Sequence, residues 1–246
     1  MTQNAFDAVP ASGDSPLLLL CDHASAALPP GMDGLGLPPE LFETHIAWDI
    51  GAAAVTRALA AATGAPAILG RWSRLLIDLN RGADDPTLVM KLSDGSIIPG
   101  NRDADAGEVA RRIAAYHAPY HAAIAAELDR MGPKAVIVSL HSFTPHWKKQ
   151  PRKWEVGILY DRDRRLADPL MARLAEAGFI VGDNEPYSGA LDGDTLNQHG
   201  TRRGLPHVLV EMRQDLVGDP GLAQAFAARL KPILDMALED MNNPQK

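Results

Sequence analysis

Short runs of consecutive apolar residues recur along the chain, and most of them are followed by glycine, proline or charged residues. Such runs, bounded by turn-forming residues, are typical of strands buried within a sheet. They predict strands over residues 16–22, 65–71, 73–81, 134–142, 154–163, 179–189 and 207–215.

Longer segments with apolar residues at helical spacing lie between these runs, and they predict helices over residues 39–64, 105–132, 167–178 and 219–240. The first helix is expected to end at Gly64, and the second to kink at Pro119. Residues 24–40 and 82–103 have no sustained period and are predicted as loops, the second with a functional role. Because strands alternate with helices throughout, we expect an α/β fold, a three-layer α/β/α sandwich with a mixed, largely parallel sheet.

The composition is that of an ordinary globular protein. The chain has 246 residues, of which 46% are hydrophobic and 22% charged, so we expect a single domain over residues 1–246 with loose ends at 1–14 and 242–246. The net charge of -7 disfavours nucleic-acid binding, and no apolar run is long enough to span a membrane. The single cysteine, Cys21, excludes an internal disulfide and a cysteine-rich zinc site, and we expect a cytoplasmic protein.

Polar side chains gather where several predicted strands end. These are Asp22, His23, Asp78, Asn80, Arg81, His141, Glu211 and Arg213. If the strands run parallel, these side chains meet along one edge of the sheet, where α/β proteins bind their ligands. Two histidines, several carboxylates and an arginine at one edge suit a zinc hydrolase.

Common catalytic motifs of other classes are absent from the sequence. The chain contains no H-E-x-x-H, no G-x-S-x-G and no glycine-rich phosphate loop between a strand and a helix. A serine hydrolase would have to use Ser139 or Ser142 without the sharp strand-to-helix turn that normally exposes such a nucleophile.

The segments that carry the polar residues resemble those of known hydrolases. "SLHSFTP", "LIDLNR" and "VEMRQD" resemble segments of zinc carboxypeptidases that supply a zinc-binding histidine, a carboxylate-binding Asn-Arg pair and a general-base glutamate. The chain is more similar to the N-formylglutamate amidohydrolase family, which shares that zinc-carboxypeptidase-like, phosphorylase/hydrolase-like fold. The segments that carry this similarity are "CDHAS", "HIAWDIGA", "SRLLIDLNR", "HSFTP", "GILYD", "DNEPYSG", "NQHG" and "EMRQDL".

The resemblance implies a Zn²⁺ cofactor held by His23, His141 and a third ligand. The H-x-x-E motif of carboxypeptidases is absent, because His23 is followed by "ASA". Asp49, in "HIAWDIGA", is the expected third ligand. Asp22 and His45 remain alternatives, although Asp22 would point to the opposite face of a strand from His23, and His45 lies one helical turn before Asp49.

The implied reaction is hydrolysis of an N-formyl or other short N-acyl amide of an amino acid such as N-formyl-L-glutamate, which gives formate and belongs to histidine breakdown. Glu211 is the expected general base. Arg81, with Asn80, is expected to clamp the carboxylate of this small anionic substrate. His199 and Arg74 are the expected partners of the oxyanion.

Further residues are assigned to the pocket only by the resemblance. Asn184 and Tyr187, in "DNEPYSG", are expected to line the substrate pocket, although a turn explains the asparagine equally well. The basic stretch at residues 146–154 is expected to be a solvated loop near the mouth of the site. The sequence does not indicate the oligomeric state.

Structural explanations and other functions compete with these assignments. Asp78 is expected to pair with Arg74 or Arg81, and the i, i+4 pair His117 and His121 is expected to pack within its helix instead of binding metal. Three other functions stay open: a zinc carboxypeptidase or amidase acting on peptides or peptidoglycan fragments, a non-catalytic binding protein of the same fold, and a metal-free serine hydrolase.

Overall fold

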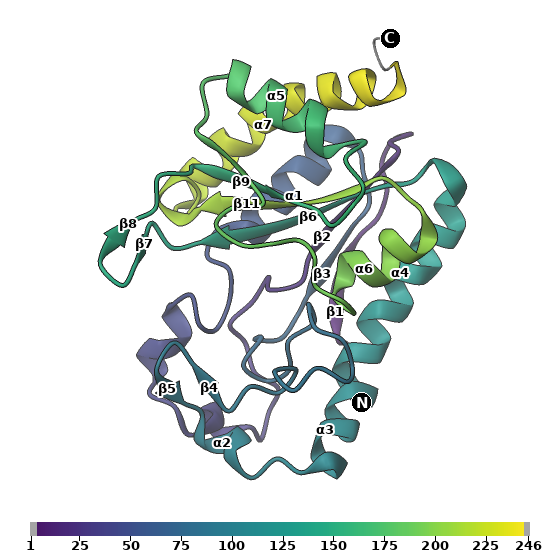
Figure 1. The fold of residues 1–246 in the computed structure, drawn as a ribbon. Helices are drawn as coiled ribbons and strands as arrows, with labels where there is room; N and C mark the ends of the chain where they lie inside the picture. Colours follow the sequence, from purple (N-terminus) through teal and green to yellow (C-terminus); the bar gives the residue numbers. More distant parts are fainter. Residues whose placement is uncertain (1–3, 244–246) are drawn as a thin grey trace.

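The chain folds around a seven-stranded sheet in the computed structural model, which describes residues 4–243 (Figure 1). The strands are β1 Phe6–Val9, β2 Leu17–Cys21, β3 Ala67–Gly70, β6 Val136–Phe143, β9 Val156–Leu159, β10 Val181–Asp183 and β11 His207–Arg213. Their order is β1-β3-β2-β6-β11-β9-β10. The four strands β3, β2, β6 and β11 are parallel, and β1, β9 and β10 run the other way, so the sheet is mixed as predicted.

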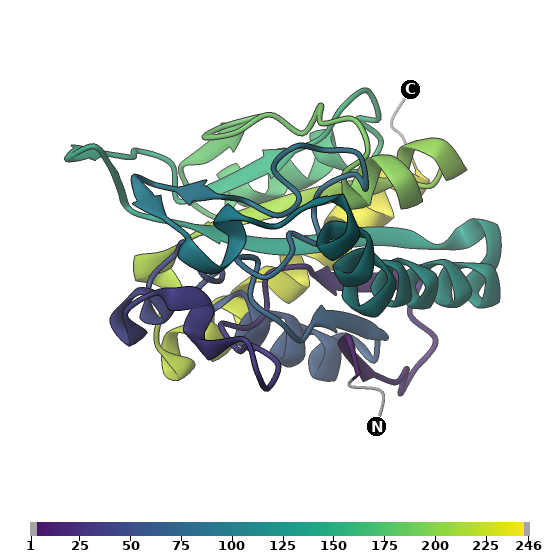
Figure 2. The same ribbon diagram turned by 90° about the horizontal axis from the view of Figure 1, so that it is seen from below.

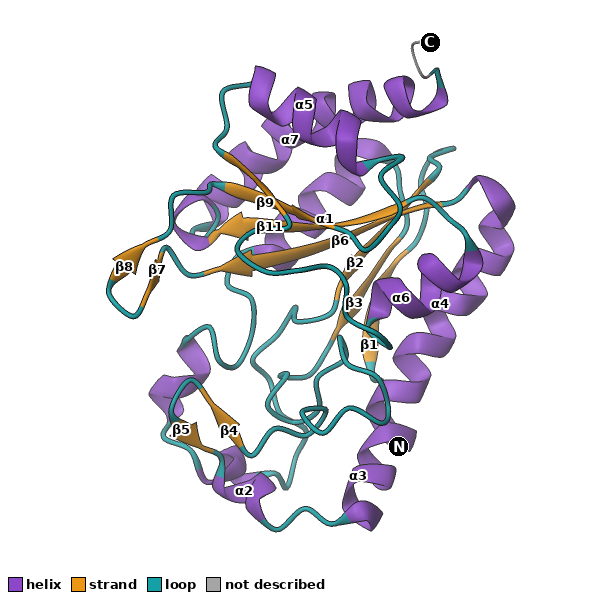
Figure 3. Cartoon of the chain, viewed as in Figure 1, coloured by secondary structure: helices purple, strands orange, loops and turns teal. Residues whose placement is uncertain are grey.

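Helices cover both faces of this sheet and complete the predicted three-layer sandwich (Figure 3). On one face lie α1 Ala52–Thr63, α5 Ala167–Glu176 and α7 Pro220–Asn242, whose apolar residues share a core with the strands. On the other face lie α3 Ala106–Arg112, α4 Ala118–Met131 and α6 Thr195–His199, with a second core. Among residues 4–243, no helix is both long and apolar enough to cross a membrane.

Two short hairpins stand apart from the main sheet. One is formed by β4 Leu92–Ser93 and β5 Ser96–Ile97 and is followed by α2 Pro99–Arg102. The other is formed by β7 His146–Trp147 and β8 Gln150–Pro151, and it projects from the side of the molecule opposite to α4 (Figure 2). Both hairpins lie in segments that were expected to be loops.

The alternation of side chains along β6 places polar residues on one face. Val136, Val138 and Leu140 belong to the core under α1, α5 and α7, whereas Ile137 belongs to the core under α4. Because successive side chains of a strand point to opposite faces, His141 lies on the α4 side, at the carboxyl end of the strand.

The predicted helix over residues 39–64 is wrong in its first half. Residues Pro39–Glu43 form a short 3₁₀ helix, and α1 begins only at Ala52. Gly51 has φ 86°, and a Cβ at this position would lie 2.2 Å from the Val217 carbonyl oxygen, so the chain makes a turn that only glycine accommodates. The helix ends at Gly64 as predicted, with φ 68°.

The predicted strand over residues 73–81 is also wrong, because this apolar stretch forms consecutive turns. Leu75, Leu76 and Ile77 are buried, but they are not paired with a neighbouring strand. The Leu76 N–H donates to the Ser73 carbonyl within the segment. The carbonyls of Leu75 and Leu76 accept from the side chains of Asn101 and Arg112. The predicted helix over 105–132 is divided by a π-helical segment, Ile113–His117, which ends two residues before Pro119. At the amino end, Phe6–Val9 forms the edge strand β1 within the segment that was expected to be loose.

Candidate active site

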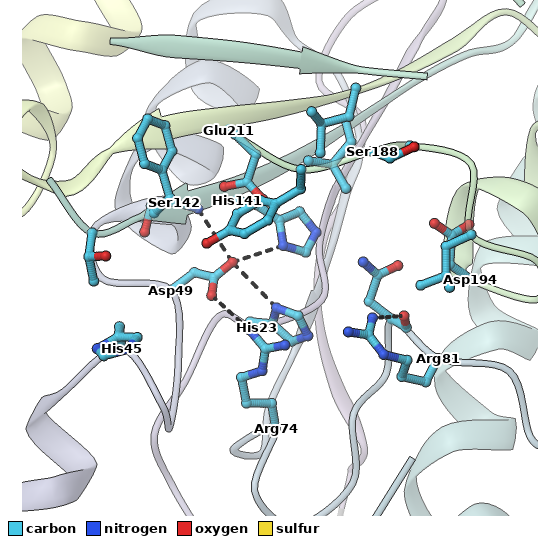
Figure 4. Close-up of a pocket in the computed structure, with 18 residues that line it drawn as sticks. His23, His45, Asp49, Arg74, Arg81, His141, Ser142, Ser188, Asp194 and Glu211 are labelled. Atoms are coloured by element: carbon cyan, nitrogen blue, oxygen red, sulfur yellow. Dashed lines mark hydrogen bonds and ion pairs between the residues drawn. The ribbon is translucent and has the colours of Figure 1, made fainter. Parts of the chain in front are cut away.

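Three buried side chains converge where the parallel strands end. His23 follows β2, Asp49 lies in the turn before α1, and His141 belongs to β6. Their candidate ligand atoms lie within 4.8 Å of one another. The Asp49 Oδ2 atom is 3.3 Å from Nδ1 of His23 and 2.8 Å from Nδ1 of His141 (Figure 4).

A buried carboxylate holds the far side of each imidazole ring. The Nε2–H of His23 donates to Asp78 at 2.6 Å, and the Nε2–H of His141 donates to Asp22 at 2.9 Å. A neutral ring that carries its proton on Nε2 presents a lone pair on Nδ1. Metal-binding histidines are oriented in this way by carboxylates. The two Nδ1 atoms and the Asp49 oxygen therefore fit the donor set of a divalent metal ion.

Asp22 is fixed by further hydrogen bonds within the second core. It accepts from the hydroxyls of Tyr120 at 3.1 Å, Ser139 at 3.0 Å and Thr195 at 2.6 Å. Burial alone would raise the pKa of Asp22, but the hydrogen bonds that it accepts from His141 and Thr195 help to lower it well below its usual range. The Asp22 carboxylate thus stays ionised and keeps the His141 ring in one orientation.

Arg74 bridges two carboxylates of the cluster, those of Asp49 and Asp78. Its guanidinium donates to Asp78 at 2.9 Å and to Asp49 at 3.4 Å. Asp78 is therefore shared between His23 and Arg74, which confirms the expected Asp78–Arg74 pair. These contacts balance buried negative charge around the site.

Glu211 lies beside His141 in the sheet. The two residues are paired in the register of β11 and β6. The Glu211 Oε2 atom is buried, and no described residue provides it with a hydrogen-bond partner. Burial, with the charge of Asp49, raises the pKa of Glu211 to about 7. A carboxylate with such a pKa can take up and release a proton near neutral pH.

The site lies in a pocket with a volume of about 280 Å³. Its wall includes the predicted residues His23, Asp49, Arg74, Asn80, Arg81, His141, Tyr187 and Glu211. Arg81 and Asp194 lie at one end, Ser142 and His45 lie at the other, and the His23–Asp49–His141 cluster lies between them (Figure 4).

Two histidines bind the backbone of the segment around Asn80 and Arg81. His117 lies at the end of the π-helical segment, and His121 lies in α4. The Nε2–H of His117 donates to the Arg81 carbonyl at 2.8 Å, and that of His121 donates to the Leu79 carbonyl at 3.0 Å. The Arg81 guanidinium donates to the Asn80 carbonyl at 2.8 Å. The two histidines were expected only to pack within their helix, and they also hold the backbone of this segment in place.

Two predicted site residues do not line the pocket. His199 is buried on α6, and its Nε2 lies 2.9 Å from Nδ1 of His121, so it faces this histidine instead of the site. The Asn184 side chain accepts from the backbone N–H groups of Tyr160 and Gly189, both at 3.0 Å. It therefore shapes the loop that carries Tyr187, whereas Tyr187 itself lines the pocket.

The two alternatives for the third ligand have other partners. His45 lines the pocket, but its Nε2 lies 3.3 Å from Asp94 of the β4–β5 hairpin, and the helix expected to place it beside Asp49 is absent. Asp22 contacts His141 from behind. Sequence reasoning missed this Asp22–His141 contact and the pocket-lining Asp194; the only available signal was the position of Asp22 at the end of a buried strand.

Comparisons with known proteins agree with one another. A family model described as N-formylglutamate amidohydrolase matches residues 15–217. An N-formylglutamate deformylase from Pseudomonas aeruginosa is 30% identical over 243 residues, which cover 89% of this chain and 88% of that protein.

Solved structures extend the likeness over almost the whole chain. A gene product from Agrobacterium tumefaciens has a TM-score of 0.92 at 36% identity, over 98% of this chain and 97% of that one. An N-formylglutamate amidohydrolase from Ralstonia eutropha JMP134 shares the fold, with a TM-score of 0.68 at 22% identity over 97% of each chain. The chain therefore belongs to the N-formylglutamate amidohydrolase family, a family of amide hydrolases.

Proposed function

We propose that this protein is a zinc-dependent amidohydrolase that cleaves the N-formyl amide of an amino acid such as N-formyl-L-glutamate, giving formate and the free amino acid. With that substrate the reaction belongs to histidine breakdown. The observation that carries the proposal is the convergence of His23, Asp49 and His141 beside Glu211, a buried carboxylate without a hydrogen-bond partner among the described residues.

The metal would be held by Nδ1 of His23, Nδ1 of His141 and the carboxylate of Asp49. Three protein donors of this kind are typical of catalytic zinc sites, which keep a further position open. When bound, Zn²⁺ would supply Lewis-acid activation of water and of the formyl carbonyl. Asp22 and Asp78 would keep both imidazole rings oriented and their Nδ1 atoms free of protons.

Glu211 is the proposed proton carrier. Its carboxylate would accept a proton from the attacking water as the new C–O bond forms. It would then give this proton to the amide nitrogen as the C–N bond breaks, so that the amino acid leaves as an amine. The raised pKa of Glu211, about 7, suits both steps. Arg74 would contribute positive charge to the developing oxyanion from the pocket wall.

Arg81 is the proposed clamp for the α-carboxylate. Its guanidinium lines the pocket, and no carboxylate of the described residues lies within 4.0 Å of it, so its charge is available to a ligand. A planar guanidinium can hold a carboxylate through two parallel hydrogen bonds. The pocket volume of about 280 Å³ suits a substrate of the size of one amino acid.

Formate release tests the proposal directly. The purified protein is incubated with N-formyl-L-glutamate before and after treatment with a chelator and again after Zn²⁺ is restored. We expect formate release that the chelator abolishes and that Zn²⁺ recovers. Chelator-resistant release would overturn the metal mechanism, and absence of release from the zinc-loaded protein would overturn the assigned substrate.

A further inference from the structure

A second arginine, Arg152, lies behind the wall of the pocket, on the segment after β8. The Arg152 guanidinium packs over the rings of Phe143, at 5.4 Å, and Tyr187, at 5.2 Å. Its NH1 group donates to the carbonyl of Thr144 at 3.3 Å and lies 3.4 Å from the Thr144 hydroxyl. Phe143, Thr144 and Tyr187 all line the pocket, so Arg152 contacts three of its wall residues.

Arg152 has no acidic partner within 4.0 Å among residues 4–243. This separates it from Arg74, which is paired with Asp49 and Asp78, and from the nearby Arg213, which is paired with Asp215 at 2.7 Å. Aromatic rings hold the guanidinium by its flat faces, and such stacking leaves N–H groups at its edge available.

Arg81 and Arg152, which both lack an acidic partner within 4.0 Å among residues 4–243, contact opposite ends of the pocket. Arg81 lies at the end of the pocket marked by Asp194 (Figure 4). Arg152 packs on Phe143 and Thr144, the residues that directly follow Ser142 at the other end. An amide held over His23, Asp49 and His141 would therefore have one unpaired guanidinium on each side.

We propose that Arg152 binds the side-chain carboxylate of the substrate, so that the enzyme selects N-formyl amino acids with an acidic side chain. This inference rests on the proposed function. Arg81 would hold the α-carboxylate and Arg152 the second carboxylate, and the two arms of such a substrate diverge from the same Cα. A guanidinium can hold a carboxylate through charge-assisted hydrogen bonds from the N–H groups at its edge.

Arg152 could instead serve only to tie the β7–β8 hairpin to the loop that carries Tyr187. That structural role would affect every substrate alike. A pair of substrates that differ only in the charge of the side chain separates the two roles, and N-formyl-L-glutamate and N-formyl-L-glutamine form such a pair.

The experiment measures kcat/KM for both substrates in the wild-type enzyme and in Arg152→Gln, Arg152→Lys and Lys153→Gln. Lys153 is the matched control, because its ammonium group lies 5.0 Å over Trp154, a ring outside the pocket wall. We expect Arg152→Gln to lower kcat/KM for the glutamate substrate by about 10- to 100-fold and to leave the glutamine substrate nearly unchanged. Arg152→Lys should recover part of the loss, and Lys153→Gln should match the wild type.

An equal loss on both substrates, or no loss, would overturn the role of Arg152. Calorimetric binding of L-glutamate and L-glutamine, the product and its neutral counterpart, gives a readout that needs no turnover. If the Arg152→Gln variant binds glutamate as tightly as the wild type does, Arg152 does not bind the side-chain carboxylate. A zinc-loaded enzyme that releases formate from neither substrate would overturn the proposed function instead, and the binding comparison would still decide the role of Arg152.

Discussion

Glu211 and His141 occupy paired positions on the neighbouring parallel strands β11 and β6, and both side chains line the same pocket. The register of one strand pair thus places a carboxylate with a raised pKa beside a histidine of the candidate metal cluster. Neither loop flexibility nor a long side-chain reach is needed to bring them together, because adjacent strands in a sheet are about 5 Å apart.

Replacement of Glu211 by glutamine should stop proton transfer but leave the metal cluster intact. We expect kcat to fall by about 10² to 10⁴-fold, since glutamine cannot accept the proton, with metal content unchanged. Steady-state formate release and elemental analysis measure the two quantities. Glu176→Gln, an exposed carboxylate on α5, is the control and should keep wild-type kcat. Retention of most of the activity by Glu211→Gln would show that another group carries the proton.

Asp78→Asn should weaken metal binding, although Asp78 is not one of the three proposed donors. Its carboxylate orients the His23 ring through a hydrogen bond of 2.6 Å. Loss of such a partner typically lowers metal affinity about 10- to 100-fold. Competition with a chromophoric chelator measures the affinity, and the exposed Asp168→Asn is the control. An affinity equal to that of the wild type would contradict the role given to Asp78.

Arg81→Gln should reduce recognition of the α-carboxylate. We expect kcat/KM for N-formyl-L-glutamate to fall about 10- to 100-fold, because a charge-assisted hydrogen bond is lost. For N-formyl-L-isoglutamine, whose α-carboxylate is an amide, the same substitution should change kcat/KM little. Equal effects on the two substrates would instead indicate a general distortion of the pocket.

Three buried histidines under the Asn80–Arg81 segment should make folding sensitive to acid. Burial lowers the pKa of His121 to about 3 and that of His199 to about 4, and it also lowers the pKa of His117. Below about pH 6.5 the unfolded chain binds protons on these residues while the folded chain does not. Through these residues, the free energy of unfolding is therefore highest above that pH, and it decreases as the pH falls towards 4.

His199→Gln isolates this effect, since the glutamine amide can still donate to His121. From pH 7 to pH 5 the wild type should lose about 2 kcal/mol more unfolding free energy than the variant does. Urea unfolding of the metal-free proteins at both pH values measures the difference. A pH dependence that is identical in the two proteins would show that His199 titrates normally in the folded state.

The pattern of the sequence predicted the strands that carry His141 and Glu211, because buried parallel strands are continuous apolar runs. It also placed His23 at the end of β2. It could not predict that Glu211 is paired with His141, since the register depends on contacts between segments far apart in the chain.

The failures of prediction have local physical causes. Residues 73–81 are as apolar as a strand, yet they form turns. Leu75 is buried in one apolar cluster, and Leu76 and Ile77 are buried in another, a tertiary effect that the apolar pattern alone does not reveal. The helix expected through Asp49 is interrupted because Gly51 adopts φ 86° against the Val217 carbonyl. Asp22 follows β2 directly before His23 but serves His141, a pairing that depends on how β2 and β6 lie in the sheet.

The measurement that tests the central claim most directly is the metal content of the purified wild type and of His141→Ala after dialysis against a trace of zinc. We predict about one zinc ion per chain in the wild type and almost none in the folded variant, because a catalytic zinc held by three protein donors does not tolerate the loss of one. Circular dichroism confirms that the variant is folded. An unchanged metal content in folded His141→Ala would contradict the proposed site.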